Sequence, residues 1–348
     1  HQASTSGADA REGLRAGHSV NVADPKVSSQ TKHKLVSSEV KPVVESVVAG
    51  RLREFLLENP LEAKTITAKV VEAAQYVKTG KSYSLSVPRF PGMPLFPGHP
   101  PFQVVNYRTP PGIIAGDVEP WGPPNEVNLG YMAEYLMACS HSGAHIDGLA
   151  HMTIGDDNHW YGGGNTKDHM TDHGPNFGDA SKLPAFFTRG VLLDPPTYRG
   201  VDALPAHEPV GADELKAIAE AQGVEIRPWD VVLIRTGYLK YWPDAEKMNE
   251  HLTAGPDLSA AEWLLERGVV ATGTDTETYE VMPTPDRGSP ANPQPVHTKL
   301  LIENGIYLLE SIYLEDIARD KVYEFLFVML PLKIKGATGS MVDPLALV

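Results

Sequence analysis

The segment His141–His151 constrains the fold of this chain more than any other, because it carries three histidines and one aspartate at close spacing. On a helix, at about 100° per residue, Asp147 and His151 would point away from the other two side chains. On a strand, His145, Asp147 and His151 share one face by the period of two. A glycine at position 143 allows a turn that brings His141 to the same side. We therefore expect a turn that enters a strand, with the polar cluster on one face.

This cluster has the composition of a metal site. Neutral imidazole and carboxylate suit Zn²⁺ or Mn²⁺, and three protein ligands leave positions open for water and substrate. Between Arg108 and Lys167 the chain holds acidic residues but no lysine or arginine, a distribution that stabilises a cation. We predict a divalent metal, Zn²⁺ or Mn²⁺. The alternative interpretation is a histidine-rich surface loop.

The bulk composition limits the partners. Of the 348 residues, 42% are hydrophobic and 21% charged, as in soluble globular proteins of one large or two ordinary domains. The net charge of −14 argues against nucleic acid and membrane partners, since both need a basic face. We therefore expect a small-molecule substrate. The first residue is His1 rather than Met, which fits either removal of an export signal or trimming, so a cytoplasmic and an exported protein both stay open.

The chain divides into two parts. Residues 1–34 lack periodicity and predict a mobile tail, whereas Val40–Leu57 and Leu61–Lys78 have helical periodicity. We therefore expect a tail and helical extension over residues 1–80 and a main domain over 81–348. Within that domain, Pro88–Pro124 is rich in proline, glycine and aromatic residues, which predicts a loop. It would either cover the core or form an aromatic wall of a substrate pocket.

The second half alternates strand and helix patterns, which predicts an α/β fold. The expected strands are 191–193, 231–234, 269–272, 306–309 and 324–330, and the expected helices are 212–221 and 259–267. Polar residues at strand ends are natural site positions in such folds. Glu310 ends an apolar strand, where an unpaired carboxylate is costly, so it should meet a cation, an imidazole or a donor. Asp275 follows another strand, and we expect it to order a ligand histidine. No dinucleotide fingerprint follows any strand, which disfavours a nicotinamide oxidoreductase.

The motif resembles that of the cyclase family of metal-dependent hydrolases, which includes bacterial kynurenine formamidases and isatin hydrolases. The family signature is H-x-G-T-H-x-D-x-P-x-H, and this chain departs from it at Ala144 and Leu149. The resemblance runs roughly from Ser82 to Val342. It implies an α/β fold of the swivelling β/β/α type, which carries an N-terminal helical extension here.

The resemblance also implies roles for particular residues. The implied metal ligands are His141, His145 and Asp147. His151 would be the catalytic acid–base residue, and a fourth ligand is the alternative. His297 and Glu310 would hold a second metal together with Asp147. For His297, a substrate-binding or supporting role stays open.

We therefore expect a metal-dependent hydrolase that uses a metal-activated water to cleave a C–N bond of a small amide or lactam, similar to an arylformamide or isatin. One alternative is lactone or ester hydrolysis at the same site. The other is a non-catalytic metal- or ligand-binding protein, which His151 disfavours because binding alone needs no proton acceptor. The resemblance further implies a homodimer or homotetramer, in which the N-terminal helices or the Pro-rich loops reach the neighbour's site.

Overall fold

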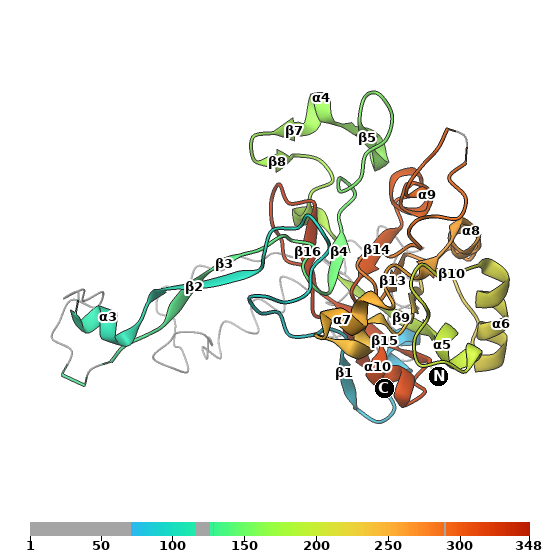
Figure 1. Ribbon diagram of the computed structural model, residues 1–348, viewed down its shortest axis with the longest axis horizontal. Helices are drawn as coiled ribbons and strands as arrows, with labels where there is room; N and C mark the ends of the chain where they lie inside the picture. The colour runs from blue at the N-terminus through green and yellow to red at the C-terminus, as the bar shows by residue number, and fades with distance from the viewer. Residues whose placement is uncertain (1–70, 116–125, 128, 289) are drawn as a thin grey trace, which may run out of the picture.

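The computed structural model describes residues 71–115, 126–127, 129–288 and 290–348, and a nine-stranded sheet forms its centre (Figure 1). The strand order is β1-β17-β15-β9-β11-β13-β14-β4-β16. The bounds in that order are Ser82–Ser84, Leu345–Leu347, Glu324–Met329, Phe186–Leu193, Val231–Ile234, Ala271–Thr274, Tyr307–Glu310, His145–Asp147 and Gly339–Met341. Strands β9, β11, β13 and β14 run parallel, and the outer strands pair antiparallel with them. This mixed arrangement confirms the predicted α/β class.

The central strands are buried on both faces, which explains why they appear in the sequence as continuous apolar runs. On one face, α6 (Ala212–Gln222) and α8 (Leu258–Glu266) pack Leu215, Ile218 and Leu264 against the sheet. Helix α8 begins at Asp257, whose side chain accepts a hydrogen bond from the Ala260 amide. Both helices lie within two residues of the bounds that the sequence predicts.

The remaining elements are short. The helices are α3 (Pro110–Ala115), α4 (Thr166–His169), α5 (Pro195–Arg199), α7 (Ala245–Asn249), α9 (Pro295–His297) and α10 (Glu315–Arg319). A π-helix, Thr298–Glu303, continues α9, and single 3₁₀ turns lie at Tyr161–Gly163, Ala180–Lys182 and Tyr238–Tyr241. Three small ribbons are formed by β5 (His159–Trp160) with β6 (Gly164–Asn165), β7 (Met170–Thr171) with β8 (Gly174–Pro175), and β10 (Pro209–Val210) with β12 (Gly255–Pro256).

A fourth ribbon projects away from the body (Figure 1). It consists of β2 (Gln103–Arg108) and β3 (Ala133–Met137), which pair antiparallel. The sequence pattern predicted a loop throughout Pro88–Pro124, and for β2 this prediction is wrong. The β-branched and aromatic residues of Gln103–Arg108 favour an extended chain, a signal hidden by the prolines around it.

Most of the predicted N-terminal extension lies outside the described residues, including the tail and the first helix. Within the part that the structure describes, no helix has the length and apolar character needed to cross a membrane.

Candidate metal centre

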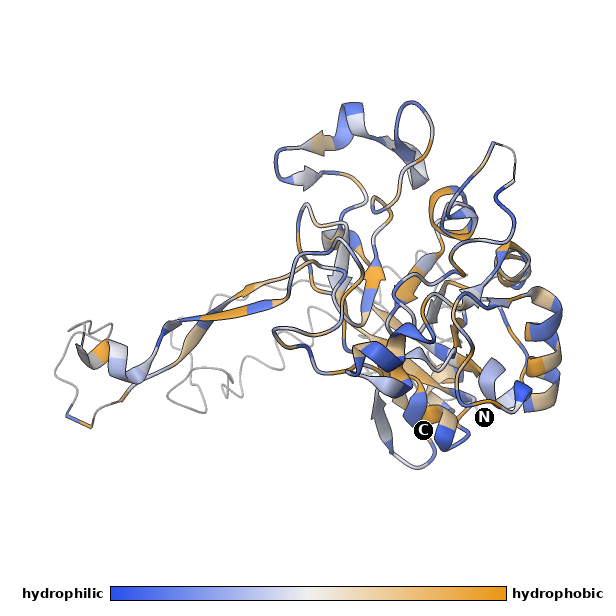
Figure 2. Ribbon diagram, viewed as in Figure 1, coloured by the Kyte–Doolittle hydropathy of each residue, from blue (hydrophilic) through white to orange (hydrophobic). Residues whose placement is uncertain are grey.

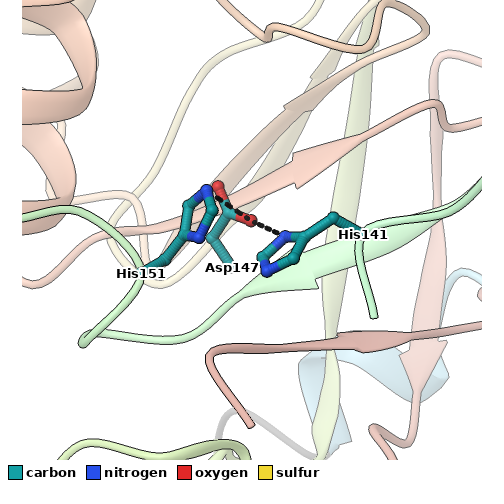
Figure 3. Close-up of side chains that lie close together, drawn as sticks. All are labelled: His141, Asp147 and His151. Carbon is teal, nitrogen blue, oxygen red and sulfur yellow. Dashed lines mark hydrogen bonds and ion pairs between the residues drawn. The ribbon is translucent and has the colours of Figure 1, made fainter. Parts of the chain in front are cut away.

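Asp147 lies at the centre of a cluster of imidazoles from four different histidines. Its Oδ1 lies 2.9 Å from His141 Nδ1, 3.6 Å from His145 Nε2 and 4.0 Å from His151 Nε2, and its Oδ2 lies 3.8 Å from His297 Nε2. The carboxylate is fully buried, and Oδ2 has no hydrogen-bond partner among the described residues. A buried carboxylate oxygen without a donor is costly, and a bound cation would remove that cost. Figure 3 shows how His141 and His151 face this carboxylate.

The strand that carries the motif is shorter than predicted. Strand β4 ends at Asp147, and the chain then turns, so that the His151 amide donates to the Gly148 carbonyl at 2.9 Å. The Gly148 amide donates to the Thr338 carbonyl at 2.7 Å, and a Cβ at Gly148 would lie 2.6 Å from that oxygen. The predicted turn and strand are therefore confirmed for His145 and Asp147. His151 reaches the cluster from the following turn instead of from the strand.

The strands on either side of β4 complete the cluster. In the antiparallel register Glu310 of β14 lies opposite His145, and its Oε2 comes within 3.1 Å of His145 Nε2. On the other side, Gly339 of β16 lies opposite Asp147. A Cβ at Gly339 would lie 2.4 Å from the ring of His141, so glycine is required here for His141 to pack against the strand.

The ligand atoms form two groups that share Asp147. One consists of His141, Asp147 and His151, and the other of His145, Asp147 and Glu310; within each group the ligand atoms lie within 4.8 Å of one another. His297 Nε2 lies 3.3 Å from Glu310 Oε1, on the side of the second group. The structure thus brings all six predicted site residues together. Their roles as ligand or acid–base residue stay predictions.

Hydrogen bonds fix the orientation of two of these imidazoles. His145 Nδ1 donates to the Gly143 carbonyl at 2.7 Å, which leaves Nε2 as the atom with a free lone pair. His297 Nδ1 donates to Glu280 Oε1 at 2.6 Å. Glu280 is fully buried and also accepts from the amides of Val296 and His297. Glu280 therefore positions both the short helix α9 and the ring of His297.

Asp275, for which the sequence predicted a supporting role of this kind, lies elsewhere, and that prediction is wrong. The Asp275 carboxylate accepts from the amide and hydroxyl of Thr236 and from the amide of Gly237, each at 2.7 Å. Because β11 and β13 are parallel neighbours, the carboxylate after β13 meets the turn after β11. Asp275 stabilises that turn, and burial raises its pKa to about 6.

Two residues from the segment before the ribbon reach the centre, and neither was predicted from the sequence. The Arg89 guanidinium donates to the carbonyl of Ser142 at 2.8 Å, to that of Ala144, and to that of Val342 at 2.9 Å. These bonds hold the turn before β4. The ring of His99 lies 6.3 Å from that of His141, and its Nδ1 is buried without a hydrogen-bond partner in the described part of the chain.

The other histidines near the motif lie elsewhere. His159 pairs with Asp157 at 2.7 Å, and His169 Nδ1 accepts from the Asn165 amide at 3.3 Å. His173 lies in the exposed turn between β7 and β8. None of the three belongs to either group of possible ligands found among the described residues.

The charges of the cluster are strongly coupled. Burial alone would raise the pKa of Asp147, but the imidazoles of His151 and His141 bring it well below its usual range. Burial lowers the pKa of His151 to about 4, so its imidazole is neutral at pH 7. Burial also disfavours the charge on His297, but hydrogen bonds to Glu280 and Glu310 outweigh it and raise that pKa to about 10. A cation bound here would replace protons, so its affinity should fall at low pH.

Two stretches of the chain match known families, and the first is N-terminal. Residues 1–83 match the family model for DNA gyrase B. This part is 59% identical over 69 residues to the DNA gyrase B protein of Rickettsia typhi, and 56% identical over 71 residues to that of Caulobacter vibrioides. Each match covers 20% of this chain and 9% of the gyrase protein, so the chain spans less than a tenth of these relatives. From the sequence pattern this segment was predicted only as a tail and helical extension, and the domain boundary at residue 80 stays a prediction.

The second match covers the metal centre. The structure is similar to the crystal structure of a novel cyclase, with a TM-score of 0.69 and 25% identity over 81% of this chain and 93% of that one. It shares its fold with isatin hydrolase A from Labrenzia aggregata, with a TM-score of 0.54 and 21% identity over 79% of this chain and 95% of that one. Residues 83–281 match the family described as "Putative cyclase". Since this match spans more than half of the chain, the chain belongs to the cyclase family, as its histidine motif predicted.

Proposed function

We propose that this chain is a metal-dependent hydrolase that cleaves a C–N bond of a small amide or lactam. The observation that carries the proposal is the buried Asp147 carboxylate, whose Oδ2 lacks a donor among the described residues while imidazole nitrogens surround it. His141, His145, Asp147, Glu310 and His297 would hold one or two divalent ions, Zn²⁺ or Mn²⁺. A bound ion supplies polarisation of the substrate carbonyl and lowers the pKa of water toward about 7.

His151 differs from the rest of the cluster in its access to solvent. Its side chain is 28% exposed, whereas that of His141 is 6% exposed and that of Asp147 fully buried. The ring stacks on His141 with centroids 4.0 Å apart, which fixes its orientation. A neutral, accessible imidazole can accept a proton from an attacking water and return it to the leaving nitrogen. We therefore assign His151 the acid–base role.

The substrate class is the less determined part of the proposal. Two proteins with this fold are named isatin hydrolases, and isatin is a cyclic amide, so isatin is the first substrate to test. The chemistry of the centre would serve any activated carbonyl. For this reason an aryl lactone belongs in the same panel, together with an N-formyl arylamine.

The test begins with metal content. Full-length protein purified without chelator should contain at least one equivalent of a divalent ion by elemental analysis, and Asp147→Ala should lose it. Metal-loaded protein should then hydrolyse at least one amide or lactam of the panel. Hydrolysis of the lactone alone would replace the C–N assignment by ester hydrolysis. Bound metal without hydrolysis of any of the three would support a binding protein instead.

A further inference from the structure

The ribbon of β2 and β3, which we call the arm, exposes apolar side chains on both of its faces (Figures 1 and 2). On one face Val105 lies opposite Tyr135, and the rings of Tyr107 and Tyr135 lie 4.7 Å apart. On the other face Val104 lies opposite Leu136. These five side chains are between 43% and 60% exposed, although they are residue types that normally pack.

An arm of this kind needs a partner. A two-stranded ribbon is marginally stable in water by itself, and neither strand of the arm belongs to the nine-stranded sheet. Contiguous exposed apolar residues mark surfaces where proteins associate. The outer edges of both strands also carry backbone groups that another chain can pair with. The arm is therefore built as an interaction surface.

We propose that the arm docks on a second copy of this chain, and that the arm of that copy docks in return. Such a reciprocal contact uses the same surfaces twice and closes as a dimer. The chain from Gln103 to Met137 comprises about 35 residues, enough for the roughly 20–30 residues per side of a standard interface. The body offers a surface of matching chemistry in Leu330, Leu332 and Ile334, which are exposed on the segment that leads into β16.

Charge also favours a second copy. The chain has a net charge of −14, so two copies repel each other over most of their surface. The two strands of the arm carry one positive side chain, Arg108, and one negative side chain, Glu134, and are therefore neutral. A neutral apolar arm is where two acidic copies can approach with little repulsion.

The arm connects directly to the metal centre at both of its ends. His99, whose ring lies 6.3 Å from that of His141, precedes β2 by four residues. His141 itself follows the end of β3 by four residues. A second copy that fixes the arm would also fix these two segments. The dimer stands independently of the proposed hydrolase activity, because it rests on the arm alone.

Sedimentation equilibrium of the full-length chain between about 1 and 100 µM tests the proposal. Wild-type protein should have twice the chain mass of 37.8 kDa. The double variant Val105→Lys/Tyr135→Glu removes one apolar face, and because the two positions are opposite in register the new charges can pair and preserve the ribbon. Val104→Lys/Leu136→Glu does the same on the other face. At least one of these variants should be monomeric.

A matched control is available on helix α5 and just after it. Tyr198 and Val201 are 50% and 45% exposed, similar to the residues replaced in the arm, and they lie outside it. Tyr198→Glu/Val201→Lys should stay dimeric. If the charged arm variants unfold, as judged by circular dichroism, the milder Val105→Thr/Tyr135→Thr should still weaken dimerisation about tenfold or more. A monomeric wild type, or folded arm variants that dimerise as tightly as the control, would overturn the proposal.

Discussion

Replacing Arg89 by methionine tests whether the turn before β4 is held from outside the motif. The guanidinium donates to the carbonyls of Ser142, Ala144 and Val342, and methionine retains most of the aliphatic stem without any donor. Hydrogen bonds to charged groups contribute about 1.5–3 kcal/mol each when buried. Arg89 is only partly buried, so we take the lower part of that range and expect a total loss of about 3–4 kcal/mol.

The expected loss is large enough to measure in two ways. At about 2–4 °C per kcal/mol for a domain of this size, the melting temperature of metal-free protein should fall by roughly 6–15 °C. Because the turn orients His141 and His145, affinity for the metal should also fall, by about 10–100-fold as for other supporting residues. Differential scanning fluorimetry and competition with a chelating dye measure the two effects.

Arg227 provides the control, since it forms only exposed ion pairs of 3.3 and 3.4 Å with Glu72 and Glu225. Such pairs contribute little, so Arg227→Met should change the melting temperature by no more than a few degrees. Arg89→Lys keeps the charge but not the fork of donors, and it should fall between the wild type and Arg89→Met. Equal stability and equal metal affinity of Arg89→Met and Arg227→Met would refute this role of Arg89.

Three further predictions concern the centre itself. His151→Ala should keep its metal while kcat falls by about 10²–10⁴-fold, and loss of metal from this variant would show that His151 is a ligand. Glu280→Ala should lower metal affinity by about 10–100-fold, because it leaves the ring of His297 unsupported; Glu303→Ala, at an exposed position, is the control and should bind metal as tightly as wild type. Burial lowers the folded-state pKa of His151 to about 4, below its ordinary value of 6.5. The unfolded chain therefore binds more protons between these values, so metal-free protein should lose stability as pH falls from about 6.5 toward 4. Urea unfolding across that range, compared with His151→Ala, checks this prediction, and an equal pH dependence of the two proteins would contradict it.

The motif could be interpreted from the sequence because its geometry is local. The period of a strand places His145 and Asp147 on one face whatever surrounds them, and the glycine at position 143 adopts a positive φ of 64° in the turn before them. Glu310 could be placed for a related reason, since a carboxylate that ends an apolar strand needs a partner. The alternation of strands and helices likewise indicated the α/β class.

Tertiary structure decided everything that depends on residues far apart in the chain. Strand β4 stops at Asp147 because Gly148 meets the Thr338 carbonyl, and no local pattern announces a contact across almost two hundred positions. The partner of His297 is Glu280 because α9 begins beside that carboxylate. The arm was hidden because its strand β2 is surrounded by prolines and pairs with β3 across a long excursion. Spacing along the chain determines which side chains share a face, whereas only the packed fold determines which groups meet them there.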